Sequence, residues 1–233
     1  GSYISILSPT FLNHLPTVEV VPSVWLLSHR HQCRIFQNQN IPDIIKQVLT
    51  HGGISSDQFR FSLKKNYSPR DYCVQYRETD LAFISRLMEE YGIFYFFEHA
   101  QDQHVLVIGD DPVAHVPILD PAKVLYHLPG TTAVSDQEHV REYRFNREIR
   151  PSMVSLRDFD FEKPRLDLSA KAKANGDNKL EIYDYPGEFF VLSQGNDLAN
   201  VRLQELQATK QLGSGKSDCR RLIPGYRFTL DRH

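Results

Sequence analysis

Three segments carry apolar residues at the spacing of an amphipathic helix. The first, 42–51, follows Asn40, a residue type that favours the N-cap position. The second, 79–91, ends at Gly92, which suits the positive φ common just beyond a helix. The third covers about 197–212. The pattern therefore predicts three helices.

Most of the remaining chain alternates apolar and polar residues with the period of a half-buried strand. Such alternation covers 59–64, 72–77, 142–149 and 166–173. Residues 93–98 and 104–108 predict a hairpin across the short polar segment between them. Because strands come in runs and do not alternate regularly with helices, the sequence predicts a β-rich α+β fold with antiparallel sheet.

Composition narrows the function classes. The chain has 233 residues, 41% of them hydrophobic, which is enough to bury a core. The formal net charge of -2 gives no global basic field for nucleic acid or an anionic membrane. Three cysteines, far apart in the chain, indicate no disulfide framework and favour a reducing compartment.

One short string has the residue types of a metal site. His29, His31 and Cys33 are spaced by two, so one strand would place all three on one face, and imidazole with thiolate suits zinc. Arg30 and Arg34 flank them and would repel a cation. A metal-dependent hydrolase built on these three residues is one alternative, and an ordinary exposed strand face is the other.

No carboxylate pair or nucleophile motif in the sequence points to catalysis. Aromatic residues make up 11% and often alternate with basic ones, which leaves a nucleic-acid or glycan-binding module as a further hypothesis. Glu142 and Glu148 interrupt this basic pattern and favour ordinary sheet packing. From the residues alone we expect a structural or interaction domain, with no enzyme activity, metal or cofactor.

Several strings together resemble one protein family. They lie at 34–37, 41–45, Asp71–His99, Tyr183–Gly187, Arg202–Glu205 and Cys219–Leu230. In this order they are similar to the VgrG (valine-glycine repeat) spike proteins of bacterial type VI secretion. The similarity extends from about residue 20 to the end, and the Asp71–His99 string is the most specific.

The resemblance implies a fold like the baseplate hub of contractile phage tails. That fold has two antiparallel β-barrels with a mixed α/β segment between them. On this basis residues 1–36 would be a remnant of the first barrel, 37–111 the mixed segment and 112–233 the second barrel.

The resemblance also implies a function. The chain would be the structural hub of a secretion spike, a trimeric adaptor between the secreted hexameric tube protein (Hcp) and the puncturing spike, without catalysis. Effector or adaptor proteins are further possible partners, and nucleic acid is not expected. Membrane contact would come only through spike regions that this chain lacks. The protein would assemble in the bacterial cytoplasm and then be secreted. A phage-tail baseplate hub protein is the alternative.

The family's motif positions also have ordinary structural interpretations. Arg77, Glu78 and Asp80 fall at the strand-to-helix corner, where acids complement the helix dipole and Arg77 could pair with one of them or with a neighbouring chain. Residues 81, 84, 87 and 88 are expected to be helix core. The motif positions expected to hold the fold are Arg77, Glu78, Asp80, Arg86, Gly92, Tyr185, Pro186, Gly187, Arg202, Pro224 and Gly225.

Overall fold

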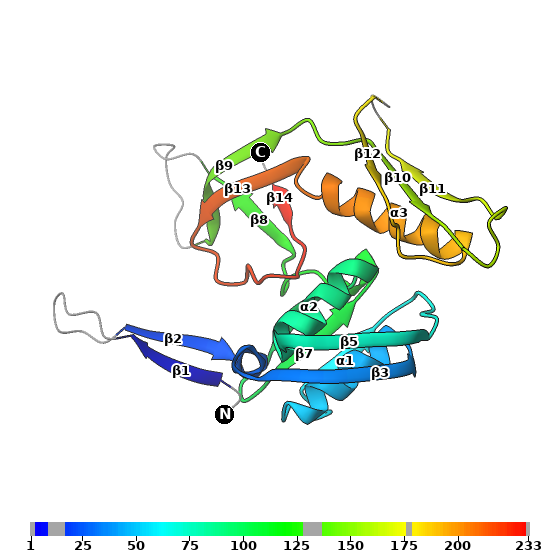
Figure 1. Ribbon diagram of the computed structural model, residues 1–233. Helices are drawn as coiled ribbons and strands as arrows, with labels where there is room; N and C mark the ends of the chain where they lie inside the picture. The colour runs from blue at the N-terminus through cyan, green and yellow to red at the C-terminus, as the bar shows by residue number, and fades with distance from the viewer. Residues whose placement is uncertain (1–2, 9–16, 128–136, 176–178, 232–233) are drawn as a thin grey trace. The chain divides into compact units, whose positions relative to one another are not determined.

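The chain folds into two compact units, seen here in a computed structural model (Figure 1). The structure describes residues 3–8, 17–127, 137–175 and 179–231. One unit comprises Gly1–Glu89 and Ile93–His115, and the other comprises Glu90–Gly92 and Val116–His233.

Helix α1 (Ile41–His51) forms where the spacing predicts it. The side chain of Asn40 caps it by accepting the backbone N–H of Asp43 at 2.9 Å. Its apolar face is fully buried and provides much of the first unit's core. The buried residues of this face are Ile41, Ile44, Ile45, Val48 and Leu49.

Helix α2 (Asp80–Tyr91) buries a slightly different face from the one expected. Leu81 is only half-buried, and Phe83 takes the core position instead, stacked on Phe36 with ring centroids 5.6 Å apart. The other core residues of the helix are Ile84, Leu87 and Met88. Gly92 follows with a φ of +67°, as expected for its position.

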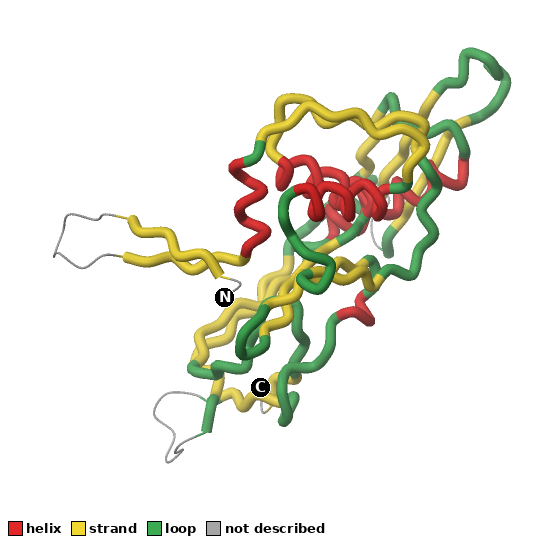
Figure 2. Tube along the Cα trace, turned by 90° about the horizontal axis from the view of Figure 1, so that it is seen from below, coloured by secondary structure: helices red, strands yellow, loops and turns green. Residues whose placement is uncertain are grey.

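The described strands of the first unit form three small sheets. The antiparallel hairpin of β1 (Tyr3–Ser8) and β2 (Thr17–Pro22) leads into the short helix η1 (Ser23–His29) (Figure 2). Strands β3 (His31–Gln39) and β5 (Arg70–Thr79) make an antiparallel ribbon. The third sheet has the order β4-β7-β6, with β4 (Phe59–Ser62), β6 (Phe94–His99) and β7 (His104–Gly109), followed by η2 (Pro112–Ala114).

The described residues of the second unit after Val116 form two sheets and one helix. The sheet of order β13-β9-β8-β14 comprises β8 (Lys123–Tyr126), β9 (His139–Arg147), β13 (Gln211–Ser217) and β14 (Thr229–Asp231). The sheet of order β11-β10-β12 comprises β10 (Met153–Asp158), β11 (Leu168–Lys173) and β12 (Glu181–Asp184). Helix α3 (Leu192–Gln207) packs on β10 and β11 through buried Ala199 and Leu203.

Helix α3 starts and ends earlier than predicted. The prediction ran to about residue 212, but Gln211–Ser217 is strand β13 and pairs with β9. Gly213 and Gly215 lie in this segment, and glycine weakens a helix. Pairing with a distant strand therefore overrides the local continuation of the helical pattern.

The fold is mixed α+β and rich in strands, as predicted, but the sheets are not purely antiparallel. The pairs β4–β7, β8–β9, β8–β14 and β10–β12 are parallel. Such pairs need long connections, which a pattern of single strands does not reveal. Within the described ranges the strands form sheets of two to four strands, and none closes into a barrel. No helix in this part of the chain is long and apolar enough to cross a membrane.

Candidate functional site

The Asp71–His99 string bends from β5 into α2 at Asp80, whose side chain is completely buried. A buried carboxylate is costly unless charges and hydrogen bonds compensate it. Asp80 Oδ2 accepts a bond of 3.1 Å from Arg30 Nε. Its Oδ1 accepts bonds from Arg34 Nη2 and, at 3.0 Å, from Gln75 Nε2. We call these four residues the Asp80 cluster. Both carboxylate oxygens are occupied within the fold, so Asp80 is not available to a substrate.

Two further hydrogen bonds link residues of the Asp80 cluster, one between two side chains and one between two backbone groups. Arg34 Nε donates to Gln75 Oε1 at 2.8 Å, and Gln75 is also fully buried. The backbone N–H of Asp80 donates to the carbonyl of Arg30 at 2.8 Å. The cluster therefore ties the chain just before β3, both strands of the ribbon and the first residue of α2 to one another.

Glu78 and Arg86 form a second contact across the same corner, at the surface. Arg86 Nε donates to Glu78 Oε2 at 2.9 Å, and its Nη2 donates to Oε1 at 2.7 Å. The same Nη2 donates to the carbonyl of Val74 at 2.7 Å. Arg86 thereby links α2 to β5, although an exposed pair of this kind contributes little by itself.

Arg77 does not pair with either acid of the corner, contrary to one of the two options expected for it. Glu78 and Asp80 are engaged by other arginines, and Arg77 lies 5.2 Å from the ring centroid of Tyr76. Its φ of +51° is unusual for a residue with a side chain. The chain thus has a left-handed residue three positions before the start of α2.

The last residue of the Tyr183–Gly187 string, Gly187, packs against the buried ring of Phe189. Phe189 is 1% exposed and lies between two glycines. A Cβ added at Gly187 would lie 2.5 Å from this ring, and one added at Gly195 would lie 2.4 Å from it. Both positions thus need glycine for close packing. This explains Gly187 of the motif as a packing residue.

The remaining motif positions lie at the surface or in turns. Tyr185 and Pro186 are exposed and joined by a cis peptide bond. Arg202 Nη1 donates to Asp184 Oδ2 at 2.9 Å in an exposed ion pair between α3 and β12. Gly225 has a φ of +87° and follows the exposed Pro224. None of these groups converges on a common point.

The metal hypothesis rested on a wrong assumption about one strand. His29 is the last residue of η1, and its ring contacts Trp25 with centroids 4.3 Å apart. β3 begins only at His31, and a register irregularity between residues 32 and 33 breaks the alternation before Cys33. In the part of the chain that the structure describes, no group of three His, Cys, Asp or Glu side chains could hold a metal ion.

Sequence reasoning missed a cluster around Glu138, just before β9. Arg221 Nε donates to Glu138 Oε2 at 2.7 Å, and the backbone N–H of Arg220 donates to Oε1 at 3.0 Å. Arg221, followed by the Arg220 N–H and the Cys219 thiol, lowers the pKa of Glu138 to about 2. Glu138 and Arg221 are 83 positions apart, so no local pattern could have paired them.

The buried histidine of the β6–β7 hairpin has a perturbed pKa. His104 pairs with His99 in the strand register, as the hairpin predicts. It is 1% exposed, and Ser23 Oγ lies 3.3 Å from its Nε2. Burial, and then the neighbouring His99, lower the pKa of His104 below its usual 6.5. The neutral imidazole is therefore the form that this hairpin stabilises.

Nearly the whole chain matches one known family. Residues 12–233 match the family model of the phage tail baseplate hub (GPD). The chain belongs to this family. The resemblance stated from the motif strings is confirmed. Asp80, Arg86 and Gly187 make the contacts described above within this fold.

The hub chain is similar in sequence to secretion spike proteins. It is 39% identical to the type VI secretion system spike protein VgrG1b of Pseudomonas aeruginosa over 216 residues, which are 91% of this chain and 29% of that protein. It is 36% identical to VgrG1c of the same species, over 93% of this chain and 30% of that protein. VgrG3 of Vibrio cholerae is 31% identical over 93% of this chain and 21% of that protein. The hub chain thus spans less than a third of these relatives.

Solved structures share the fold at low sequence identity. The E. coli c3393 protein, described as a component of the type VI secretion system with structural similarity to T4 bacteriophage tail proteins gp27 and gp5, matches with a TM-score of 0.64 and 21% identity. That match covers 94% of this chain and 45% of that chain. A tail protein from Neisseria meningitidis matches with a TM-score of 0.57 and 11% identity, over 97% and 68% of the two chains.

Proposed function

We propose that the hub chain is the structural hub of a type VI secretion spike. The observation that carries this proposal is its 39% identity with VgrG1b across 91% of the chain. In this role the chain adapts the secreted tube protein to the puncturing spike. Its two barrels would be completed in the assembled protein, where strands of neighbouring segments or copies add to open sheet edges other than that of β12.

The hub role requires rigidity and no catalysis. The polar motif residues support this, because Asp80, Glu78 and Arg86 bind one another or their neighbours within the fold. Such contacts fix the angle between β5 and α2. A purified hub with an intact fold should therefore have no hydrolytic turnover, with or without added zinc.

A trimer is the proposed oligomeric state, and the β3–β5 ribbon offers a surface for it. One face of the ribbon buries Phe36 and Cys73. The other face exposes Ile35 to 60%, Val74 to 37% and Tyr76 to 64%. We call these last three residues the apolar ribbon face. Exposed apolar clusters of this kind are typical of protein interfaces.

Native mass spectrometry of the complete protein that carries this chain tests the trimer. We expect a trimer for the unaltered protein and dissociation for the double variant Ile35→Lys, Tyr76→Lys. Val113→Lys is the matched control, because Val113 is 63% exposed but lies in η2, outside the ribbon. A monomeric parent protein would refute the trimer. A trimeric double variant would refute the apolar ribbon face as its interface.

The same proposal implies which proteins the hub contacts and how it leaves the cell. The hexameric tube protein (Hcp) would contact the hub trimer, with effector or adaptor proteins attached elsewhere. The protein would assemble in the bacterial cytoplasm and leave through the secretion apparatus. Immunodetection in culture medium tests this: the protein should appear there only when the apparatus is intact.

A phage-tail baseplate hub protein is the second candidate, because the family itself is named for that structure. The two candidates differ in where the protein is found. A phage hub would be recovered in purified tail particles, whereas a secretion spike would be released without particles.

A further inference from the structure

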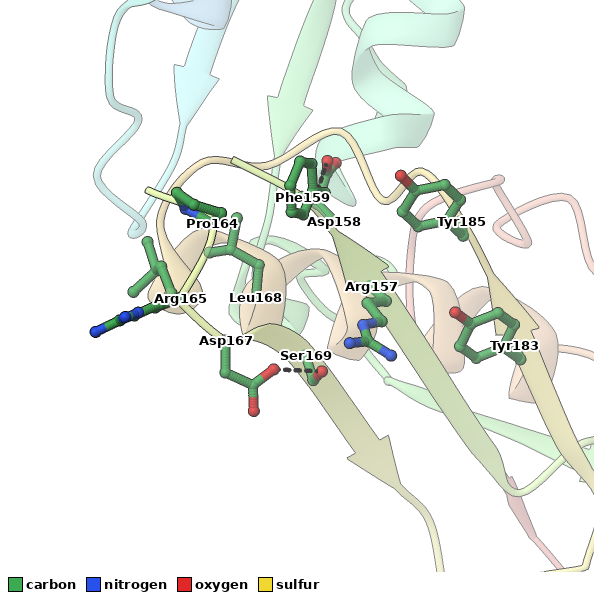
Figure 3. A pocket seen from close by; sticks show the side chains of 11 residues that line it. Arg157, Asp158, Phe159, Pro164, Arg165, Asp167, Leu168, Ser169, Tyr183 and Tyr185 are labelled. Atoms are coloured by element: carbon green, nitrogen blue, oxygen red, sulfur yellow. Dashed lines mark hydrogen bonds between the residues drawn. The ribbon is translucent and has the colours of Figure 1, made fainter. Parts of the chain in front are cut away.

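A hollow of about 720 Å³ lies on the sheet β11-β10-β12. Val154 and Leu156 of β10 and Ala170 of β11 are buried against α3. Because side chains alternate along a strand, Arg157 of β10 points to the opposite face. Figure 3 shows the Arg157 side chain between Ser169 of β11 and Tyr183 of β12. The hollow is therefore on the face of the sheet away from α3.

The cations of this face have no partners among the residues that the structure describes. In the described ranges, Arg157 and Arg165 line the hollow without an ion pair or hydrogen bond from their guanidinium groups. Lys171 and Lys173 lie on the same face of β11 and are exposed. These four side chains are hydrated cations that an acidic ligand could bind without displacing an existing partner.

The carboxylates that line or border the hollow are already used as acceptors. Asp158 accepts the backbone N–H groups of Phe159 at 2.7 Å and of Phe189 at 3.2 Å. Asp167 accepts the hydroxyl of Ser169 at 2.6 Å. On the neighbouring strand, Glu181 accepts the Ser155 hydroxyl at 2.5 Å. Among the described residues, three engaged carboxylates thus line or border a hollow whose face carries four unpaired cations. The negative charges of these carboxylates would repel a continuous phosphate backbone. Separate carboxylates of a ligand could still approach the cations one at a time.

The strand beside the hollow has an open edge. β12 is the outermost strand of its sheet and pairs, among the described strands, only with β10. Its side chains are exposed, with Tyr183 at 61% and Ile182 at 40%, and Tyr185 continues the surface at 55%. An open strand edge with exposed aromatic side chains is suited to accept an added strand.

We propose that the hollow and the edge of β12 bind an extended, acidic segment of a partner protein. The segment pairs its backbone with β12, places carboxylates against Arg157 and Arg165, and packs apolar side chains on Tyr183 and Tyr185. This site goes beyond the proposed hub assembly. It is built from residues separate from the apolar ribbon face, so either can be wrong without the other.

Fluorescence anisotropy with labelled peptides tests the site on the complete protein. The probe is an alternating Glu-Val peptide long enough to cover β12. We expect it to bind, to weaken as salt is raised, and to bind about tenfold or more weakly to Arg157→Gln. Arg141→Gln is the matched control, since Arg141 is exposed on β9 of the other sheet and should leave binding unchanged.

Three comparison probes test separately the charge of the ligand, its pairing with the strand edge and its chemical class. A Lys-Val peptide should not bind, because the face carries the same charge. A Glu-Val peptide that is N-methylated at alternate residues should lose binding, since it cannot pair with a strand edge. Oligothymidine should bind no better than the Lys-Val peptide.

Several results would overturn the proposal. These are no binding of the Glu-Val peptide, equal binding by Arg157→Gln, equal binding of the Lys-Val peptide, or full binding of the N-methylated peptide. Oligothymidine binding without peptide binding would favour nucleic acid instead. Self-association that Tyr183→Ser abolishes, without peptide binding, would assign the edge to a second copy of the chain. Circular dichroism of each variant establishes that its fold is intact.

Discussion

At the scale of single residues, the polar motif positions of the strand-to-helix corner differ in burial and therefore in the cost of losing a partner. Asp80 is the clearest case, because a fully buried carboxylate is held by two guanidinium groups and one amide. Removing one partner of such a group leaves the others unpaired, which costs more than the pair itself contributes. The exposed Glu78–Arg86 pair has no comparable penalty, since water can replace either partner.

Replacing Asp80 by Asn should therefore lower the stability of the first unit by about 3 kcal/mol. Trp25 is the only tryptophan and lies in η1 of the first unit, so its fluorescence during urea unfolding reports on this unit. Glu78→Gln is the control and should cost less than about 1 kcal/mol. Equal effects of the two substitutions would contradict the role assigned to Asp80.

Sequence reasoning placed Asp80 at the helix start but could not supply its partners. Arg30 and Arg34 lie 50 and 46 positions away, beyond any local pattern. The metal hypothesis was wrong for a related reason, because the element that carries His29 was not known from the sequence. Spacing alone put His29 on a strand, whereas the chain from 23 to 29 forms a short helix. Local spacing predicts on which face of an element a residue lies only when it is known whether that element is a helix or a strand.

At the scale of elements, the β6–β7 hairpin contains a titratable core residue. The pKa of His104 is lowered, first by burial and then by His99. The unfolded chain therefore binds a proton more readily than the folded one. The stabilisation by neutral His104 is complete above its unfolded pKa of 6.5 and is lost as the pH falls below that value.

Replacing His104 by Gln should reduce the loss of stability between neutral pH and pH values below 6.5. The urea midpoint, followed by Trp25 fluorescence across this range, measures the difference between variant and parent. His51→Gln serves as the control, because His51 is exposed at the end of α1. A parent protein whose midpoint does not change over this range would contradict the prediction.

Helix α3 offers a case in which packing should outweigh helix propensity. Gly195 is the fourth residue of α3, so Gly195→Ala gains at most about 1 kcal/mol from helix propensity. The new Cβ, however, would lie 2.4 Å from the buried Phe189 ring, and overpacking costs about 1–3 kcal/mol. We expect a net loss of thermal stability, measured by circular dichroism. Asn196→Ala, on the exposed face of the same helix, should be neutral or stabilising.

The limits of prediction at this scale have a physical cause. The periodic α1 and α2 were predicted closely, because their apolar faces are buried within one unit. The end of α3 was predicted too far along the chain, because residues 211–217 pair with β9. Strand pairing over such separations depends on the whole unit, so it overrides local propensity.

At the scale of the whole molecule, composition and periodicity gave only a β-rich α+β chain without a catalytic pattern. The family was inferred from long sequence strings in a fixed order, above all Asp71–His99. The match of residues 12–233 to the family model confirms it. The barrels and their boundaries at 36 and 111 stay predictions, since the described sheets do not close. Closure depends on strands that no local pattern identifies.

The position of the Asp80 cluster along the chain has a consequence for folding kinetics. Its ion pairs join residues 46 and 50 positions apart, so they form only after a long loop has closed. We expect these contacts to be absent from the transition state. Asp80→Asn should then speed unfolding in stopped-flow experiments while leaving the refolding rate nearly unchanged. A slower refolding rate in this variant would place the corner in the folding nucleus.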